Sequence, residues 1–120
     1  MTVRLRAVLW TTLVLSMSSS AAVAEDLNCN VGPLTKMYGA TSWLIYSCHD
    51  ESRIVVVTAP GSLASPFYFL VSLGSDRIYL QGEGTGRKDL TDAAYKDLLS
   101  LSARDISALI AETKEVVPPN

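Results

Sequence analysis

The chain has 120 residues, with 10 basic and 12 acidic side chains and a net charge of −2 at neutral pH. This length fits one small domain. A slightly acidic chain lacks the basic face that marks nucleic-acid-binding proteins, so we expect no nucleic acid among its partners.

Residues 1–24 have the layout of a secretory signal peptide. Arg4 and Arg6 give a positive start, residues 7–17 are apolar, and small residues lead up to Ala24. Such a leader is removed on export, so we expect cleavage after Ala24 and a periplasmic or secreted protein. The apolar run is short for a bilayer span, so we expect no stable membrane anchor after cleavage; an N-terminal anchor is the alternative. Cleavage would leave 8 basic and 12 acidic residues, a net charge of −4.

The only two cysteines, Cys29 and Cys48, both follow the predicted leader. In an oxidising compartment we expect them to form a disulfide. A free reactive thiol is the alternative. A metal site is disfavoured because the chain has a single histidine and no CxxC spacing. We expect neither a metal ion nor a cofactor.

The predicted domain covers residues 25–120 and starts with an irregular lead-in at 25–40. This segment has no clear hydrophobic period and contains two glycines and a proline. We expect at most one short strand in it, near residues 35–38. A disulfide from Cys29 to Cys48 would hold the lead-in against the first strand of the sheet.

Residues 41–82 are the part of the chain richest in β-branched and aromatic residues, which favour strands. They predict a four-stranded antiparallel meander with strands near residues 42–48, 53–59, 67–73 and 77–81.

Two short loops determine the predicted register of the strands. The four-residue loop 49–52 pairs Tyr46 with Val55, and the three-residue loop 74–76 pairs Val71 with Tyr79. In the second hairpin, one face then holds Tyr68, Leu70, Ile78 and Leu80. The other face holds Phe69, Val71, Tyr79, Arg77 and Gln81 and is the more polar of the two. We therefore expect the helices to pack against the first face.

A helical pair is predicted at residues 89–115, which makes the fold α+β with both helices packed on one face of the sheet. Asp89 or Thr91 can cap the first helix. Ser102 and Asp105 form a capping box, which predicts a break near residue 101 and a new helix from residue 103. Residues 116–120 are expected to form a frayed tail. The second helix has the spacing to bury Ile106, Leu109, Ile110 and Thr113.

The glycine-rich stretch Gly82–Gly86 follows a predicted strand and precedes a helix, as phosphate-binding turns do. Arg87 and Lys88 add positive charge beside it. The spacing is GxGxG, however, and no βαβ unit surrounds it. We favour a flexible crossover from the sheet to the helices.

His49, next to Asp50 and Glu51, is the one histidine that a hydrolase-type site could use. No GxSxG motif accompanies it, and a histidine at a hairpin tip is normally solvated. We therefore assign no catalytic, cofactor-binding or metal-binding residue and expect no enzyme activity.

Both faces of the predicted strands are apolar, although two helices can cover only one face. The second face is covered either by the lead-in at residues 25–40 or by a partner surface, since large exposed apolar patches usually mark binding sites. The candidate interaction surface consists of Phe69, Val71, Tyr79 and Trp43.

The chain resembles a group of small exported bacterial proteins of unknown function. The resemblance rests on WLIYSCHDESRIVVVTAPGSLASPFYFLVS, on the GEGTG that follows, and on a helical ALIAETK. A more distant likeness, to the C-type periplasmic lysozyme inhibitors, rests on the strand Tyr46-Ser47-Cys48. This chain differs from those inhibitors by ending in two predicted helices.

These observations favour an exported binding or interaction module without catalysis, acting as a monomer or weak homodimer. The alternative is an inhibitor-like protein that binds a cationic envelope enzyme such as lysozyme, which the second resemblance implies. A small hydrolase-type enzyme is the third hypothesis.

Overall fold

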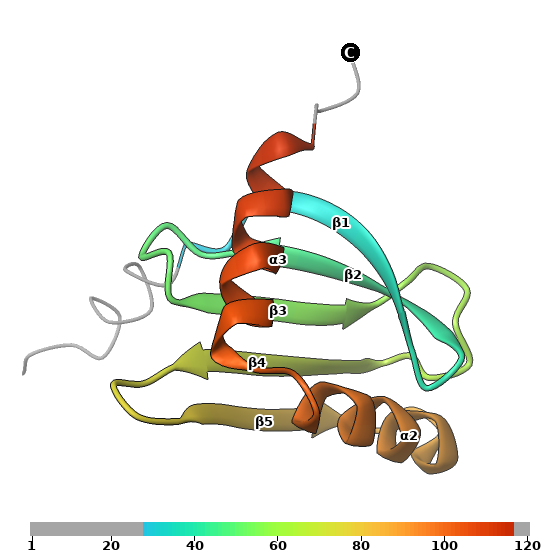
Figure 1. Ribbon diagram of the computed structural model, residues 1–120. Coiled ribbons are helices and arrows are strands. Elements are labelled where there is room, and N and C mark those ends of the chain that lie inside the picture. The colour runs from blue at the N-terminus through green and yellow to red at the C-terminus, as the bar shows by residue number, and fades with distance from the viewer. Residues whose placement is uncertain (1–27, 117–120) are drawn as a thin grey trace, which may run out of the picture.

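The protein forms a five-stranded antiparallel sheet followed by two helices (Figure 1). The structure, a computed structural model, describes residues 28–116, so the predicted leader and the last four residues lie outside the described residues. The strands follow one another in the order β1-β2-β3-β4-β5, which confirms an α+β fold built on an antiparallel meander. The elements are β1 (Val31–Tyr38), β2 (Thr41–Ser47), β3 (Arg53–Thr58), β4 (Phe67–Leu73), β5 (Ile78–Gly84), α2 (Lys88–Leu99) and α3 (Ala103–Glu115).

The first strand corrects the prediction of an irregular lead-in and of four strands. β1 pairs antiparallel with β2, with Thr35 opposite Leu44 and Met37 opposite Ser42. Its pairing is interrupted by an irregularity between Val31 and Leu34. A proline in a strand suggests a break, but an edge strand tolerates it, and β1 lies at the edge of the sheet.

The register of the β2–β3 hairpin is as predicted. Tyr46 lies opposite Val55, and Leu44 opposite Val57. A hydrogen bond from the Cys48 amide to the Arg53 carbonyl, 3.0 Å long, closes the hairpin across the four-residue loop.

The register of the β4–β5 hairpin differs from the prediction by one residue. Val71 lies opposite Leu80, and Tyr79 opposite Ser72. The Gly74 amide donates a 2.8 Å hydrogen bond to the Arg77 carbonyl, so the loop has two residues and not three. Because side chains alternate between the faces of a strand, this shift places Leu80 on the same face as Val71.

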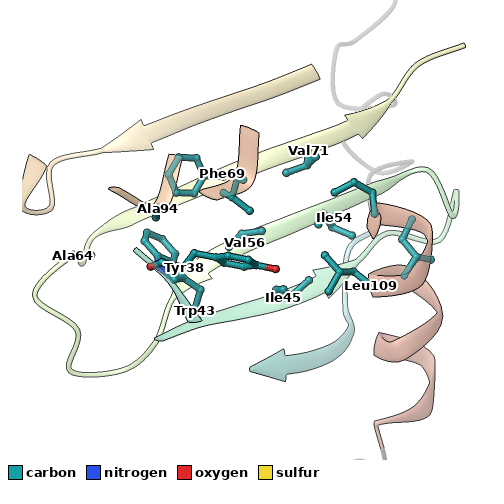
Figure 2. Close-up of a cluster of buried hydrophobic side chains, with 13 residues drawn as sticks. Tyr38, Trp43, Ile45, Ile54, Val56, Ala64, Phe69, Val71, Ala94 and Leu109 are labelled. Atoms are coloured by element: carbon teal, nitrogen blue, oxygen red, sulfur yellow. The ribbon is translucent and has the colours of Figure 1, made fainter. Parts of the chain in front are cut away.

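Both helices pack on the face that carries Trp43, Phe69 and Val71, not on the face predicted for them. In Figure 1 the two helices lie on the near side of the sheet. The aromatic rings of Trp43 and Phe69 lie 5.3 Å apart, and those of Phe67 and Phe69 lie 4.9 Å apart. Figure 2 shows this core, whose buried side chains are Tyr38, Trp43, Ile45, Ile54, Val56, Ala64, Phe69, Val71, Ala94, Leu98, Ile106, Leu109 and Ile110.

The second helix begins and packs as predicted. The Asp105 amide donates to Ser102 Oγ over 3.1 Å, and the Ser102 amide donates to Asp105 Oδ2 over 2.8 Å, which completes the capping box. The helix buries the four predicted residues, Ile106, Leu109, Ile110 and Thr113.

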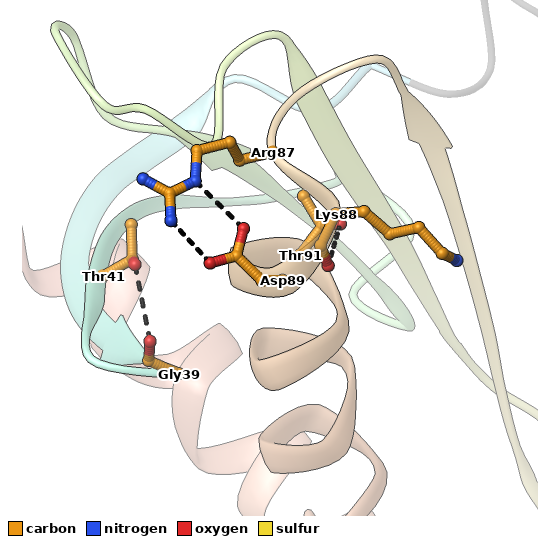
Figure 3. A network of polar contacts seen from close by, with 6 residues as sticks. All are labelled: Gly39, Thr41, Arg87, Lys88, Asp89 and Thr91. Atoms are coloured by element: carbon orange, nitrogen blue, oxygen red, sulfur yellow. Dashed lines mark hydrogen bonds and ion pairs between the residues drawn. The ribbon is translucent and has the colours of Figure 1, made fainter.

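The first helix has a different start from the one predicted. Its N-cap residue is Arg87, and no side chain caps it. Asp89 instead binds the Arg87 guanidinium through two hydrogen bonds of 3.0 and 2.7 Å, and Thr91 donates to the Lys88 carbonyl (Figure 3). Neither Asp89 nor Thr91 is therefore the cap.

The predicted disulfide between Cys29 and Cys48 is present. Beside it, the His49 amide donates a 2.8 Å hydrogen bond to the Asn28 carbonyl. These two links hold the start of the described chain against the end of β2. Among residues 28–116, no helix has the length and apolar character needed to cross a membrane.

Candidate functional site

The four residues predicted to form an interaction surface do not lie together. Trp43, Phe69 and Val71 are at most 2% exposed and belong to the core beneath the helices. Tyr79 is 53% exposed and lies opposite Ser72, on the other face of the sheet. The cause is the one-residue difference in the β4–β5 register: the predicted register placed Tyr79 opposite Val71, whereas the observed register moves Tyr79 to the other face.

The face of the sheet opposite the helices carries two rows of apolar side chains, and neither helix covers it. One row runs Leu44, Val57, Tyr68 across β2, β3 and β4, and the second runs Tyr46, Val55, Leu70. Tyr68 is 41% exposed, and the other members of both rows are half-buried. We call this surface the open face and define it by Leu44, Tyr46, Val55, Val57, Tyr68, Leu70 and Tyr79.

A hollow of about 430 Å³ lies at one end of the open face. It is formed where β3 ends, β4 begins and β5 ends, next to the loop that carries Pro66. Most of its wall is apolar, and Glu83 contributes a carboxylate. The lining residues are Val57, Thr58, Ser65, Pro66, Phe67, Tyr68, Glu83 and Gly84.

The polar side of this hollow is a tyrosine–glutamate pair. Tyr68 and Glu83 lie directly opposite each other on β4 and β5, and the Tyr68 hydroxyl donates a 3.0 Å hydrogen bond to Glu83 Oε2. This hydrogen bond, reinforced by the negative charge of Glu83, raises the pKa of Tyr68 above its ordinary value. A carboxylate beside an apolar wall suits a ligand group that combines an apolar stem with a positive or hydrogen-bond-donating end.

The glycine-rich stretch is a packed crossover and does not present a cradle of free amides. The Thr85 and Gly86 amides donate to the Pro66 carbonyl over 3.0 and 3.1 Å, and the Arg87 amide donates to the Leu63 carbonyl. A Cβ atom on Gly86 would lie 1.6 Å from the Ala64 carbonyl oxygen, so only glycine fits there. The Thr85, Gly86 and Arg87 amides are therefore already occupied by the 59–66 loop.

His49 is exposed, and its Nε2 lies 2.7 Å from the side-chain oxygen of Asn30. The neighbouring Asp50 accepts a hydrogen bond from the Ser52 amide and pairs with Arg53 at 3.3 Å. Glu51 pairs with Lys114 of α3. Each of the three residues thus has a different partner, and they do not converge on one point.

Within residues 28–116, no three histidine, cysteine, aspartate or glutamate side chains are grouped closely enough to hold a metal ion. Comparison of the chain with protein-family models, with curated proteins and with solved structures found no match.

The sequence contained part of the signal for the open face. The alternation of strands 42–48 and 53–59 already placed Leu44, Tyr46, Val55 and Val57 on a common face. Glu83 was missed, because the predicted fourth strand stopped at Gln81 whereas β5 continues to Gly84.

Proposed function

We propose that the chain is an exported, non-catalytic binding module that holds a protein partner on the open face of its sheet. The observation that supports this proposal is the pair of apolar rows on that face. Large apolar patches on monomeric proteins usually mark interaction sites, and tyrosines at such patches supply contact area at a low cost in side-chain entropy. Export rests on the leader expected in residues 1–24.

The proposal assigns the chemistry of the site to burial and hydrogen bonding. Tyr46, Tyr68 and Tyr79 offer rings with a polar tip, and Glu83 offers a charged acceptor at the hollow. A partner would bury the apolar rows and place a donor against Glu83. Burial of the rows would supply affinity, and the pairing with Glu83 would supply orientation and specificity.

One observation favours a second candidate, inhibition of a cationic envelope enzyme such as a lysozyme. Glu83 lies in an otherwise apolar hollow, and the chain without its expected leader carries a net charge of −4. A lysine or arginine side chain of a basic enzyme could lay its stem on Tyr68 and its charge against Glu83. On this hypothesis binding weakens as salt is raised.

The binding proposal is tested by crosslinking the protein to periplasmic contents and comparing three forms of the chain. Tyr68→Ala removes a 41% exposed ring from the open face, and Tyr95→Ala removes a 40% exposed ring from α2 as a matched control. We expect wild type and Tyr95→Ala to capture the same protein and Tyr68→Ala to lose it. Equal capture by all three forms would contradict the proposal.

The inhibitor hypothesis has its own assay. The purified protein is added to lysozymes at micromolar concentration in low and high salt, together with Glu83→Gln. Salt-sensitive inhibition that Glu83→Gln weakens would support the hypothesis. Absence of inhibition at low salt would remove it and leave the binding proposal to the crosslinking result.

A further inference from the structure

The outer edge of β5 has free backbone hydrogen-bonding groups. The Gly74 amide bonds to the Arg77 carbonyl at one end of the β4–β5 ladder, and the Thr85 amide bonds to the Pro66 carbonyl at the other. Pairing is continuous between these ends, so the odd-numbered residues of β5 direct their backbone groups toward β4. The even-numbered residues direct theirs away from the sheet. These outward residues are Ile78, Leu80, Gly82 and Gly84, and no hydrogen bond from the described chain reaches them along that edge.

The two edges of the sheet are protected very differently. β1 contains Pro33, which has no amide proton, carries Lys36, has an irregularity between Val31 and Leu34, and is contacted by α3. Prolines, lysines and bulges are the usual means by which proteins prevent another strand from adding to an edge. β5 contains no proline, lysine or bulge: its seven residues are IYLQGEG, its register is unbroken, and its helix contact is with α2.

We propose that β5 pairs with β5 of a second copy of this chain, antiparallel, about a two-fold axis at Leu80. The sheets of the two copies then join into one continuous sheet. Because the axis is perpendicular to the sheet, both open faces lie on the same side of it. This inference goes beyond the proposed function and does not depend on what the open face binds.

Backbone geometry restricts the registers that such a pair can adopt. An outward-directed residue must face an outward-directed residue of the second copy, so even-numbered residues pair with even-numbered ones. With the axis at Leu80, the two Leu80 residues exchange both backbone hydrogen bonds, and Ile78 faces Gly82 of the second copy. Ile78, Leu80 and Gly82 of each strand are then paired, and Gly84 faces Asp76 in the β4–β5 turn of the second copy.

Charge selects this register among those that the backbone allows. The register with the axis at Leu80 places Arg77 opposite Glu83 of the second copy, and symmetry repeats this pair. The same register places Tyr79 opposite Gln81 of the second copy. With the axis one residue later, at Gln81, Tyr79 would face Glu83 and Arg77 would lose its acidic partner. Arg77 is free to turn to a new partner because its own pair with Asp76 is long, at 3.9 Å, and exposed. Glu83 uses Oε2 for Tyr68, which leaves its second oxygen available.

The test is sedimentation equilibrium of the purified chain over a range of concentrations, at low salt, with charge variants. Arg77→Glu sets like charges opposite each other at both symmetric positions, and Glu83→Arg does the same with the opposite sign. We expect each variant to raise the dimer dissociation constant about tenfold. The double variant Arg77→Glu/Glu83→Arg restores opposite charges and should return the constant to the wild-type range. Arg104→Glu on α3 changes the net charge by the same amount as Arg77→Glu and is the control for that variant.

A backbone variant tests the edge directly. Ile78→Pro removes an outward amide at the first residue of β5, where proline is tolerated and no bond to β4 is lost. If Ile78→Pro keeps the wild-type circular dichroism spectrum, it should be monomeric. If Ile78→Pro does not fold, the Arg77 and Glu83 variants decide the test. A wild-type chain that stays monomeric, a folded Ile78→Pro variant that still dimerises, or a double charge variant no better than the single ones would overturn the proposal.

Discussion

The hydroxyl groups of Ser47 and Thr113 lie 2.6 Å apart in the buried interface between β2 and α3. Thr113 donates its proton to the Ile110 carbonyl over 2.6 Å, so Ser47 is the donor to Thr113. Both residues are at most 1% exposed. This pair is a buried hydrogen bond that links β2 to the C-terminal part of α3.

The Ser47–Thr113 pair should be strongly non-additive in mutagenesis. Thr113→Val keeps the shape of the side chain but leaves the Ser47 hydroxyl buried without an acceptor, so we expect a loss of about 1–3 kcal/mol in the free energy of unfolding. Ser47→Ala/Thr113→Val removes both polar groups and should cost less than Thr113→Val alone. Urea unfolding of the two single variants and the double variant measures this; a double variant that loses the sum of the single losses would contradict the finding.

The disulfide should supply a large part of the stability. Cys29 and Cys48 are 19 residues apart in the sequence, and closing a loop of this size contributes about 3 kcal/mol in the chain-entropy model. Reduction with dithiothreitol should therefore lower the urea midpoint of wild type. Cys29→Ala/Cys48→Ala should start at the lower midpoint and show no response to the reductant. An equal midpoint for oxidised and reduced wild type would refute this prediction.

The capping box should make the free energy of unfolding decrease as the pH becomes acidic. Hydrogen bonds from the Ser102 amide and side chain hold the pKa of Asp105 below its ordinary value of 3.8. A lowered pKa in the folded state means that the stabilisation is complete above the unfolded value and is lost as pH falls through the folded one. In Asp105→Asn the melting temperature should therefore depend less on pH below pH about 4 than it does in wild type. Thermal melts between pH 2 and pH 6 test this, with the exposed Asp92→Asn as control.

Ser102→Ala tests the same cap from its other side. It leaves the Asp105 amide without its acceptor and should cost about 1 kcal/mol at neutral pH. Urea unfolding at pH 7 measures the loss. Ser107→Ala, at an exposed position inside the same helix, should leave stability nearly unchanged.

Tyr38 should ionise well above the ordinary pKa of a tyrosine. Burial, aided by the negative charges of Glu112, Asp105 and Asp97, raises its pKa from 10.0 to about 12. Because the folded-state pKa is raised, the stabilisation is present below pH 10 and is lost as pH rises toward 12. An ultraviolet titration should show a late ionisation that Tyr38→Phe removes. A late step that persists in this variant would assign it to another tyrosine.

Sequence reasoning succeeded where a local signal decided the structure. A four-residue polar loop determines the β2–β3 register, so Tyr46 and Val55 could be paired in advance. The capping box at Ser102 and Asp105 marks the break between the helices within a span of four residues. The cystine followed from the number of cysteines and the expected compartment.

It failed at the β4–β5 turn, which has two residues and not three, and where the deciding contacts lie far apart in the chain. Both faces of β4 are apolar, so the sequence could not show which face the helices would cover. Clustering of Phe69 with Trp43 made that choice, and the two-residue β4–β5 turn then brought Leu80 to the same side.

The sequence by itself determined which segments are strands in the centre of the sheet, where the second helix starts, and which cysteines pair, because these depend on neighbours or on composition. Only the tertiary structure decided that residues 31–38 form a fifth strand, which face is buried, and that Tyr68 and Glu83 share a hollow. These outcomes depend on burying the most apolar area at once, and that is a property of the whole sheet and both helices together.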